Sequence, residues 1–404
     1  MSQLTGEILD LAREAGADTV GISDASPFPE ARSTLWAHKD TGMSGPLRFT
    51  FDHPEEATDV TESFPWAKSL VVMGHDYLDE AETPSSTGAV VGRFATSDHY
   101  RRLRSTAEHV ADALRARGYR AEVLIDDNRL ADRLPAIRSG LGWQGRSTMV
   151  LAPGHGPWLL LGSVVTNAEL IPTRASSRTC GTCQACIPAC PTGAITADGL
   201  DARRCLSTWL QTGGSMPLWI RPLVGRRIYG CDECLVACPP GFPRFREADG
   251  RRSELAFREL LSAPDDELLE RFGHWYIPQR EARFLRRNIL VAAANSGESD
   301  AWEQIRLHLG HRSAVVRGHA AWALARSGAV DAVELLEQRL DVETIPEVVE
   351  EIDIALLMKK EPLRYGRLLA SDGRGLAGAH SAPGGVAEPI AQRHHGLGVD
   401  LAHP

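Results

Sequence analysis

The chain has 404 residues, enough for two or three domains, and 43% of them are apolar, enough to bury an ordinary hydrophobic core. Its net charge of −9 excludes a protein drawn to nucleic acid by an overall basic field, so any polyanion would have to bind a local patch. The N-terminal segment lacks the basic start and apolar run of a signal peptide, and no stretch approaches the roughly 18 apolar residues of a membrane-spanning helix. We therefore expect a cytoplasmic protein that does not associate with membranes.

Residues 1–175 are predicted to form one α/β domain. Leu4–Ala15 and Tyr100–Arg117 have the apolar periodicity of amphipathic helices, and the first ends at Gly16. Four apolar runs rich in β-branched residues predict buried strands, and these are Thr19–Ser23, Ser69–Gly74, Arg120–Ile125 and Trp158–Thr166. A stretch over 171–179 that is rich in Pro, Ser and Thr is typical of a linker.

The chain contains eight cysteines, all between Cys180 and Cys238. They follow the pattern C-x2-C-x2-C-x3-C-P, then a single cysteine, then C-x2-C-x3-C-P. This spacing is typical of proteins with two four-iron clusters, which together need eight thiolates. The sequence therefore predicts a loop-rich, ferredoxin-like domain over 176–245 that holds two [4Fe-4S] clusters. Its folding should depend on the metal.

The ligands of each cluster follow from the same motif. Three cysteines spaced two residues apart bind one cluster, and the fourth, which precedes proline, binds the other. The first cluster is predicted to be held by Cys180, Cys183, Cys186 and Cys238, and the second by Cys190, Cys205, Cys231 and Cys234, with Cys205 assigned by elimination. Two alternatives remain: a disulfide framework, which suits short secreted chains, and a pair of four-cysteine zinc sites, which rarely use this spacing.

Residues 255–360 are predicted to be entirely helical. Two segments, 286–297 and 316–328, echo each other at a distance of about 31 residues, and each is a helix of small residues that ends in Ser-Gly. This pattern predicts HEAT-like paired-helix repeats, and the alternative is an ordinary helical bundle. The Gly-, Ala-, His- and Pro-rich segment 371–404 is predicted to be a disordered tail whose histidines are solvated.

Three segments resemble the epoxyqueuosine reductase family. They are the cysteine motif over 180–195, the stretch 200–239 around the later cysteines, and 124–151 with its Gly-Leu-Gly-Trp motif. The resemblance covers roughly residues 1–330. It implies reduction of epoxyqueuosine to queuosine in the wobble position of tRNA, with cobalamin bound in an N-terminal domain similar to that of reductive dehalogenases. It also implies that both clusters pass electrons to the cobalt.

The resemblance places the catalytic acid of the family at Asp126. This carboxyl ends a predicted strand, and burial beside an apolar ligand would raise its pKa so that it holds a proton. Asp127 is the second candidate. Alternatively, Asp126 caps the next helix.

The resemblance also implies contacts to the corrin ring of cobalamin. Gly140 and Gly142 would allow close backbone approach to a bulky ligand, and Leu141 and Trp143 lie in the same motif. Ser207, two residues after Cys205, matches a position between the second cluster and the corrin. The alternatives are a plain turn with a core tryptophan and a surface serine.

Several arginines lie in the predicted helical region. Arg283, Arg286 and Arg287, together with Asn288, are candidates for tRNA contacts, and the alternative is a set of solvated helix faces. An external electron donor such as flavodoxin or ferredoxin is expected.

Two other functions stay open. The run after Cys205 lacks the tyrosine and glutamate that the family usually has there, which leaves room for a cobalamin and iron–sulfur reductase of a small epoxide or halide. A non-enzymatic electron carrier is the third possibility, but a carrier would need no long N-terminal domain.

Overall fold

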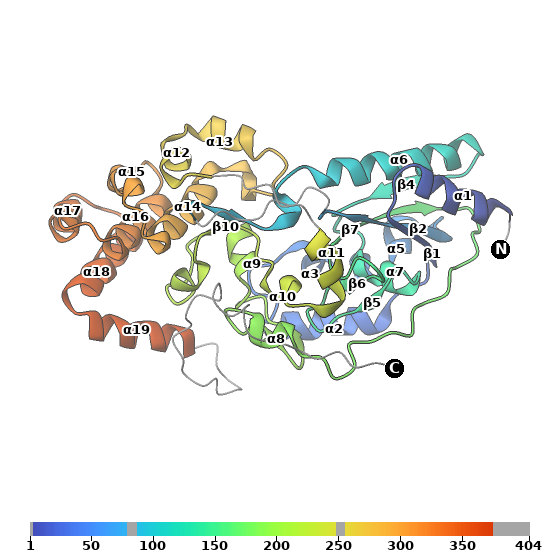
Figure 1. Cartoon of the computed structure of the whole chain (residues 1–404), viewed down its shortest axis with the longest axis horizontal. Helices are drawn as coiled ribbons and strands as arrows, with labels where there is room; N and C mark the ends of the chain where they lie inside the picture. The colour runs from blue at the N-terminus through green and yellow to red at the C-terminus, as the bar shows by residue number, and fades with distance from the viewer. Residues whose placement is uncertain (1–2, 79–86, 248–254, 375–404) are drawn as a thin grey trace.

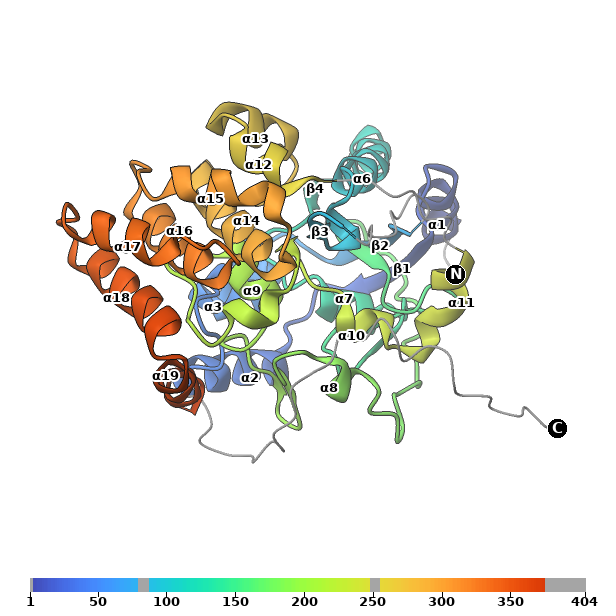
Figure 2. The same ribbon diagram turned by 60° about the vertical axis from the view of Figure 1, so that its left-hand side comes forward.

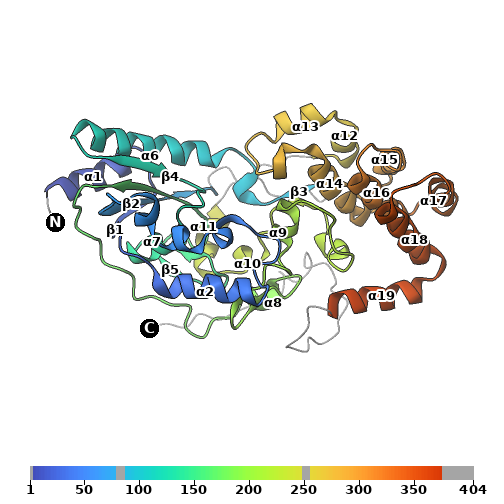
Figure 3. The same cartoon turned by 180° about the vertical axis from the view of Figure 1, so that it is seen from behind.

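The computed structural model describes residues 3–78, 87–247 and 255–374. A sheet flanked by helices lies at one end, a row of helices at the other, and the cysteine-bearing segments between them (Figure 1). The view from behind shows the same order (Figure 3).

The N-terminal half is built on a four-stranded antiparallel sheet. Its strands are β1 (Thr19–Asp24), β2 (Ser69–Asp76), β7 (Leu159–Thr166) and β4 (Ala121–Leu124), in the order β1-β2-β7-β4. Every residue of β2 is buried, as a central strand with both faces covered requires. The four predicted strands are confirmed, with small shifts at their ends.

Alternate residues of β2 point to the two faces of the sheet. On one face, Val71 and Met73 pack against α1 (Gln3–Glu14) and α6 (His99–Ala116). The apolar positions predicted for the second helix are all buried there, namely Leu103, Ala107, Val110, Ala111 and Leu114.

On the other face, Leu70 and Val72 share a core with residues of α5 (Val60–Ser63) and α7 (Arg133–Arg138). The remaining short elements on this side are α2 (Pro29–Asp40), α3 (Phe49–Asp52), α4 (Pro54–Thr58) and the hairpin of β5 (Trp143–Gln144) with β6 (Val150–Leu151).

The predicted linker has no helix or strand, but it is fastened to the edge of the sheet. The amide of Ile22 donates to Thr173 Oγ1 at 2.9 Å, and the amide of Thr173 donates to the Ile22 carbonyl oxygen at 3.0 Å. These bonds satisfy part of the exposed edge of β1.

The cysteine segments are made of short elements. In chain order they are α8 (Cys186–Ala189), β8 (Ile195–Thr196), β9 (Gly199–Leu200), α9 (Leu206–Gln211), η2 (Arg221–Val224), β10 (Arg227–Tyr229), α10 (Glu233–Val236), η3 (Pro239–Gly241) and α11 (Phe242–Glu247). Strand β10 pairs with β3 (Val90–Val91), just before η1 (Arg93–Ala95), which ties this region to the N-terminal half.

The described part of 255–374 is helical. It contains α12 (Phe257–Ser262), α13 (Asp265–Arg271), η4 (Pro278–Arg280), α14 (Ala282–Ser296), η5 (Ser299–Ala301), α15 (Trp302–His308), α16 (Ala314–Arg326), α17 (Ala332–Leu340), α18 (Pro346–Lys360) and α19 (Pro362–Arg374). The helices α14, α16 and α18 pack side by side, with α15 and α17 against them (Figure 2).

Two expectations about boundaries need correction. Helix α19 runs to Arg374, so the first four residues of the predicted tail are helical; its remainder, with His380, His394, His395 and His403, lies outside the described residues. Leu206, Leu210, Ile220 and Ile228 share one core with α12 to α18. The part of the predicted cluster domain after Cys205 is therefore anchored by hydrophobic packing rather than by loops alone.

Candidate functional site

The eight cysteine thiols are free and fall into two groups of four. In the first group, burial and then the neighbouring Cys180, Cys186 and Cys183 raise the pKa of Cys238 to about 12. Because thiolates raise one another's pKa only when they lie close together, these four thiols are neighbours. Group one is the set Cys180, Cys183, Cys186 and Cys238.

Group two is defined in the same way. Burial raises the pKa of Cys234, and the next causes are Cys231, Cys205 and Cys190. The neighbouring thiols thus match the two sets that the spacing predicts, while their assignment as cluster ligands stays a prediction. Because burial and neighbouring thiols raise these pKa values, the cysteines become thiolates only when metal cations replace their protons. Iron has this role in an iron–sulfur cluster.

Hydrogen-bond donors are aimed at the sulfur atoms of group two. Burial raises the pKa of Cys205, while the amides of Thr208 and Ser207 and the Thr208 hydroxyl lower it, because Cys205 caps the N-terminus of α9. The Cys190 sulfur accepts from the amide of Ala194 at 3.2 Å. Thr208 was not singled out from the sequence, where only its position three residues after a cysteine marks it.

Within the described residues, no three His, Cys, Asp or Glu side chains converge as ligands of a single metal ion do. A cubane differs in this respect, because each of its four thiolates binds a different iron at a different corner.

Trp143 packs beside group one, against Leu151, Cys238 and Cys180. Its indole N–H is buried and has no hydrogen-bond partner among the described residues. A buried donor without an acceptor is costly, so the arrangement suits an acceptor bound at group one.

The glycines of this motif make close contacts within the protein. A Cβ on Gly140 would stand 2.1 Å from the carbonyl oxygen of Arg174, and one on Gly142 would stand 2.3 Å from that of Leu151. Leu141 is buried in the core beneath the sheet. Chain packing, rather than approach to a ligand, therefore explains why glycine is needed at both positions. The corrin contact of this motif stays a prediction.

Asp126 lies in the turn that follows β4, in a left-handed conformation with φ of 52°. Its side chain is exposed to solvent, yet burial among surrounding protein atoms raises its pKa, as does Asp127, while Arg104 lowers it. Asp126 is thus accessible to water although protein atoms lie close around it. Its raised pKa favours a carboxyl that keeps its proton. We call Asp126 and the side chains near it the Asp126 site.

The two alternatives for this turn fit the structure less well. Asp127 accepts from Arg129 Nη2 at 2.6 Å and from Arg129 Nε at 2.9 Å, and this side-chain interaction lowers its pKa. It is therefore ionised and cannot hold a proton to donate. Asp126 caps no helix, because the next one, α7, begins at Arg133 and has Asp132 at its N-cap.

Three further side chains lie near Asp126, and a fourth, Arg133, lies beside two of them; no motif in the sequence marks these four residues. Burial, followed by Asp126 and Asp132, raises the pKa of Tyr100, and burial also raises that of Tyr229. Burial lowers the pKa of Arg133, which is itself exposed to solvent and feels the charges of Asp132, Tyr100, Cys234 and Cys205. Arg133 thus lies near Asp132 and Tyr100 and also near two thiols of group two.

Asp132 is the remaining member of the Asp126 site. Burial and then Asp126 raise its pKa well above the usual value, while the backbone amide of Asp126 stabilises its ionised form. Its Oδ1 atom is buried and has no hydrogen-bond partner in the part of the chain that the structure describes. Asp132 Oδ1 could therefore accept a hydrogen bond from a bound ligand.

Ser207 lies on α9, next to group two. It is half-buried, and its hydroxyl oxygen accepts from Gln211 Nε2 at 2.8 Å. The structure thus places it beside Cys205, as expected, while its contact to a corrin stays a prediction.

The candidate tRNA contacts on α14 need correction. Arg286, Arg287 and Asn288 are 5%, 0% and 2% exposed, so phosphates cannot reach them. Arg286 bonds Asp265 and the carbonyl oxygens of Leu261 and Ala263, and Arg287 bonds backbone carbonyl oxygens near α9. Arg283 is partly exposed and pairs with Glu281.

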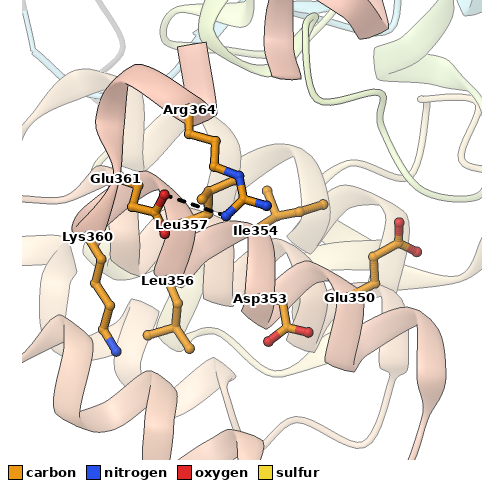
Figure 4. Close-up of a pocket in the computed structure, with 8 residues that line it drawn as sticks. All are labelled: Glu350, Asp353, Ile354, Leu356, Leu357, Lys360, Glu361 and Arg364. Carbon is orange, nitrogen blue, oxygen red and sulfur yellow. Dashed lines mark ion pairs between the residues drawn. The ribbon is translucent and has the colours of Figure 1, made fainter. Parts of the chain in front are cut away.

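Hollows lie on the described surface at two places far apart in the sequence. One, of about 350 Å³, is lined by Gln144, Gly145, Arg146, Thr179, Cys180 and Gly181, beside group one. The other, of about 360 Å³, lies on α18 and α19 (Figure 4), where Arg364 and Glu361 form an ion pair 3.5 Å long. Only the first adjoins the cysteines.

None of the described helices is both long and apolar enough to cross a membrane. The family model of the 4Fe-4S double cluster binding domain matches residues 179–241, which contain all eight cysteines.

Similarity to known proteins extends far beyond the cysteines. The epoxyqueuosine reductase of Bacillus subtilis (strain 168) is 30% identical over 379 residues, which span 89% of this chain and 96% of that protein. A crystal structure of epoxyqueuosine reductase with an epoxyqueuosine-modified stem loop of tyrosine tRNA has a TM-score of 0.79 and 27% identity, and covers 89% of this chain and 99% of that one. The same values hold for a Bacillus subtilis epoxyqueuosine reductase whose catalytic aspartate loop is swung out of the active site. The chain belongs to the epoxyqueuosine reductase family.

Proposed function

We propose that this protein reduces epoxyqueuosine to queuosine in the wobble position of tRNA, with Asp126 as the proton donor. The observation that carries the proposal is the near-complete coverage of the Bacillus subtilis enzyme, combined with eight thiols that lie in two groups of four. A solved relative that holds an epoxyqueuosine-modified tRNA stem loop supports tRNA as the substrate.

The residues fit two four-iron clusters. The donor set is eight thiols and no other ligand type, the preferred set for [4Fe-4S] clusters. At group one, the unpartnered N–H of Trp143 is available to an inorganic sulfide. We assign Cys180, Cys183, Cys186 and Cys238 to one cluster and Cys190, Cys205, Cys231 and Cys234 to the other.

The residues of the Asp126 site fit cobalamin, whose corrin ring carries amide groups at its rim. Asp132 Oδ1 has no donor within the described residues, and Arg133 is a water-accessible cation near both Asp132 and the thiols of group two. We propose that Gly140, Leu141, Gly142, Trp143 and Ser207 border this cofactor. When bound, the clusters and the cobalamin supply the electrons and the low-potential cobalt that the reduction requires.

In this proposal the residues of the Asp126 site hold and donate the protons that the reaction consumes. Conversion of an epoxide to an alkene and water consumes two electrons and two protons, and the oxygen leaves poorly unless it is protonated. Asp126 holds a proton because burial raises its pKa, and it gives that proton to the departing oxygen. Tyr100 and Tyr229 stay neutral beside it, since burial raises both of their pKa values.

Other parts of the protein have supporting roles in this proposal. The rows of α14, α16 and α18 and of α15 and α17 support HEAT-like paired-helix repeats over 255–360. We assign 1–175 to cobalamin and substrate, and 176–245 to the clusters, with 206–229 packed into the helical core. The protein acts in the cytoplasm and takes electrons from an external donor such as flavodoxin or ferredoxin.

The test is direct conversion. The protein would be reconstituted without oxygen with iron, sulfide and cobalamin, then incubated with epoxyqueuosine-containing tRNA and reduced methyl viologen. Mass spectrometry of the digested tRNA should show queuosine. If protein that retains both clusters and the corrin forms none, while the Bacillus subtilis enzyme does so in parallel, the proposal is wrong. The small-molecule reductase and the electron carrier are not favoured by the family relationship.

A further inference from the structure

We propose that an exposed surface around Cys183, formed by Arg146, Arg174 and Arg178, is the docking site for an acidic one-electron donor protein. We call it the arginine surface. The inference rests on the proposed function, because only a reductase whose electrons come from outside needs such a site.

Group one contains the cysteine that is most accessible to solvent, although Cys186 and Cys238 of the same group are buried. Cys183 is the one exposed thiol of the eight, and Cys180 lines the open hollow of about 350 Å³. The four thiols of group two are partly exposed. Arg133 of the Asp126 site lies near two of them, Cys205 and Cys234. Helix α8, which begins at Cys186, lies at the periphery of the molecule (Figures 1 and 2). Electrons from a partner protein therefore enter at group one and leave at group two.

The chain around group one has a charge opposite to that of the whole protein. The sequence has 53 acidic and 44 basic residues. Yet between Asp132 and Asp198 its basic side chains are Arg133, Arg138, Arg146, Arg174 and Arg178, and its single carboxylate is Glu169. Lys68 Nζ lies 2.6 Å from Glu169 Oε1 and neutralises it. Arg138 is paired with Asp24 at 3.0 Å, and the segment still carries a net positive charge in an acidic protein.

Three arginines of this basic segment are exposed and carry no paired carboxylate within the described residues, namely Arg146, Arg174 and Arg178. Arg146 Nη2 donates to the carbonyl oxygen of Gly181 at 3.0 Å, inside the cysteine loop. The Arg178 guanidinium lies 5.7 Å from the centroid of the Trp143 ring, which packs on Cys180 and Cys238. Arg146 and Arg178 therefore lie beside group one, and Arg174 precedes Arg178 on the same exposed segment.

A partner of the opposite charge fits this surface. Complementary charge raises the rate at which two proteins meet and aligns them before contact, by roughly 10-fold to 1,000-fold at low salt. A tRNA is also a polyanion, but its modified base must reach Asp126, whose neighbour Asp132 shares Arg133 with the thiols of group two rather than with group one. The observations therefore favour an acidic electron-transfer protein.

The experiment measures how fast the fully reconstituted chain oxidises flavodoxin hydroquinone in stopped flow. The Arg174→Glu/Arg178→Glu variant should react about tenfold more slowly at low ionic strength, and the difference should shrink as salt is added. Its oxidation of reduced methyl viologen, a small cation, should not slow, which shows that both clusters are intact. Arg13→Glu/Arg117→Glu, on the exposed ends of α1 and α6 away from α8, is the matched control and should leave both rates unchanged.

Each outcome decides the matter. An unchanged flavodoxin rate in the Arg174→Glu/Arg178→Glu variant overturns the proposal. So does a loss of affinity for the epoxyqueuosine tRNA stem loop without a change in the flavodoxin rate, which would make the arginine surface an RNA surface. If instead no tRNA is converted with viologen, the proposed function fails, and that result is separate from the docking rates.

Discussion

The Arg287 guanidinium donates to the carbonyl oxygen of Trp209 at 2.7 Å, joining helix α14 to the helix that follows Cys205. It also bonds the carbonyl oxygens of Thr212 and Gly214, at 2.9 and 2.6 Å. Beside it, Asn288 Nδ2 bonds those of Leu210 and Ile228. The C-terminal carbonyl groups of α9, which have no partner within the helix, are thus satisfied from the helical region.

We expect Arg287→Met to destabilise the protein by about 3 kcal/mol or more, because it leaves several buried carbonyl oxygens without donors. Thermal unfolding monitored by circular dichroism should show a melting temperature lower by several degrees. Arg283→Met on the same helix is the control, because its ion pair with Glu281 is partly exposed, and it should cost about 0.5 kcal/mol or less. Equal effects of the two changes would mean that the carbonyl network contributes little.

Trp143→Phe should lower the reduction potential of the cluster at group one while leaving both clusters in place. A hydrogen bond to a cluster sulfide stabilises the more negative reduced form. A bond worth about 1 kcal/mol corresponds to roughly 40 mV for one electron. Redox titration followed by electron paramagnetic resonance measures both potentials. The potential of the other cluster should stay the same, as should both potentials in Trp36→Phe on the surface of α2. An unshifted group-one potential would show that the indole bonds no sulfide.

Cys205→Ala should remove the cluster at group two and leave much of the signal of the other, because Cys205 is grouped with Cys190, Cys231 and Cys234. Iron analysis should fall from about eight to about four atoms per chain. Cys183→Ala is the reciprocal control and should damage group one. Retention of both signals in Cys205→Ala would refute its assignment as a ligand.

Asp126→Asn should leave the clusters and the corrin bound but abolish turnover, since the amide cannot supply the proton. The measurement is queuosine formation at fixed cluster and cobalamin content, compared with binding of the tRNA stem loop, which should persist. Asp127→Asn is the matched change: its carboxylate is held by Arg129, so turnover should fall little. Undiminished turnover in Asp126→Asn would remove this residue from the chemistry.

The pH dependence of turnover follows from the raised pKa of Asp126. Above the ordinary value of 3.8 the folded protein keeps this proton over a window in which an unfolded chain has lost it. Within that window the contribution of the group to stability decreases as the pH rises, and turnover should fall with the protonated fraction. A rate profile that rises with pH across the same range, at constant tRNA binding, would contradict an acid role.

The sequence predicted the sheet strands, the helices α1 and α6, and the two sets of cysteines, since each depends on local periodicity or on fixed spacing. It did not predict that 206–229 joins the helical core, because that depends on contacts between Leu206 or Ile228 and helices far along the chain. The prediction for Arg286 and Arg287 failed for a related reason. Arginine is usually exposed, and only the tertiary structure shows carbonyl oxygens gathered around a buried one.

Tyr100, Asp132 and Arg133 were also missed around Asp126. They come from α6 and from the start of α7, and only the folded chain places them near one turn. The glycines of the Gly-Leu-Gly-Trp motif were noticed, but their close neighbours are backbone carbonyl oxygens of Arg174 and Leu151. A glycine in the sequence indicates that a side chain does not fit at that position, but only the structure shows which neighbouring atoms leave no space for it.

The shared core of α9, η2 and β10 with α12 to α18 has a consequence for how this molecule could be dissected or could evolve. A fragment that stops after residue 245 would expose Leu206, Ile220 and Ile228 to water and would tend to aggregate, even if every cysteine were present. Insertions or losses of terminal helices are tolerated only beyond those that cover this apolar surface. The helical C-terminal region therefore stabilises the segments that carry the redox centres.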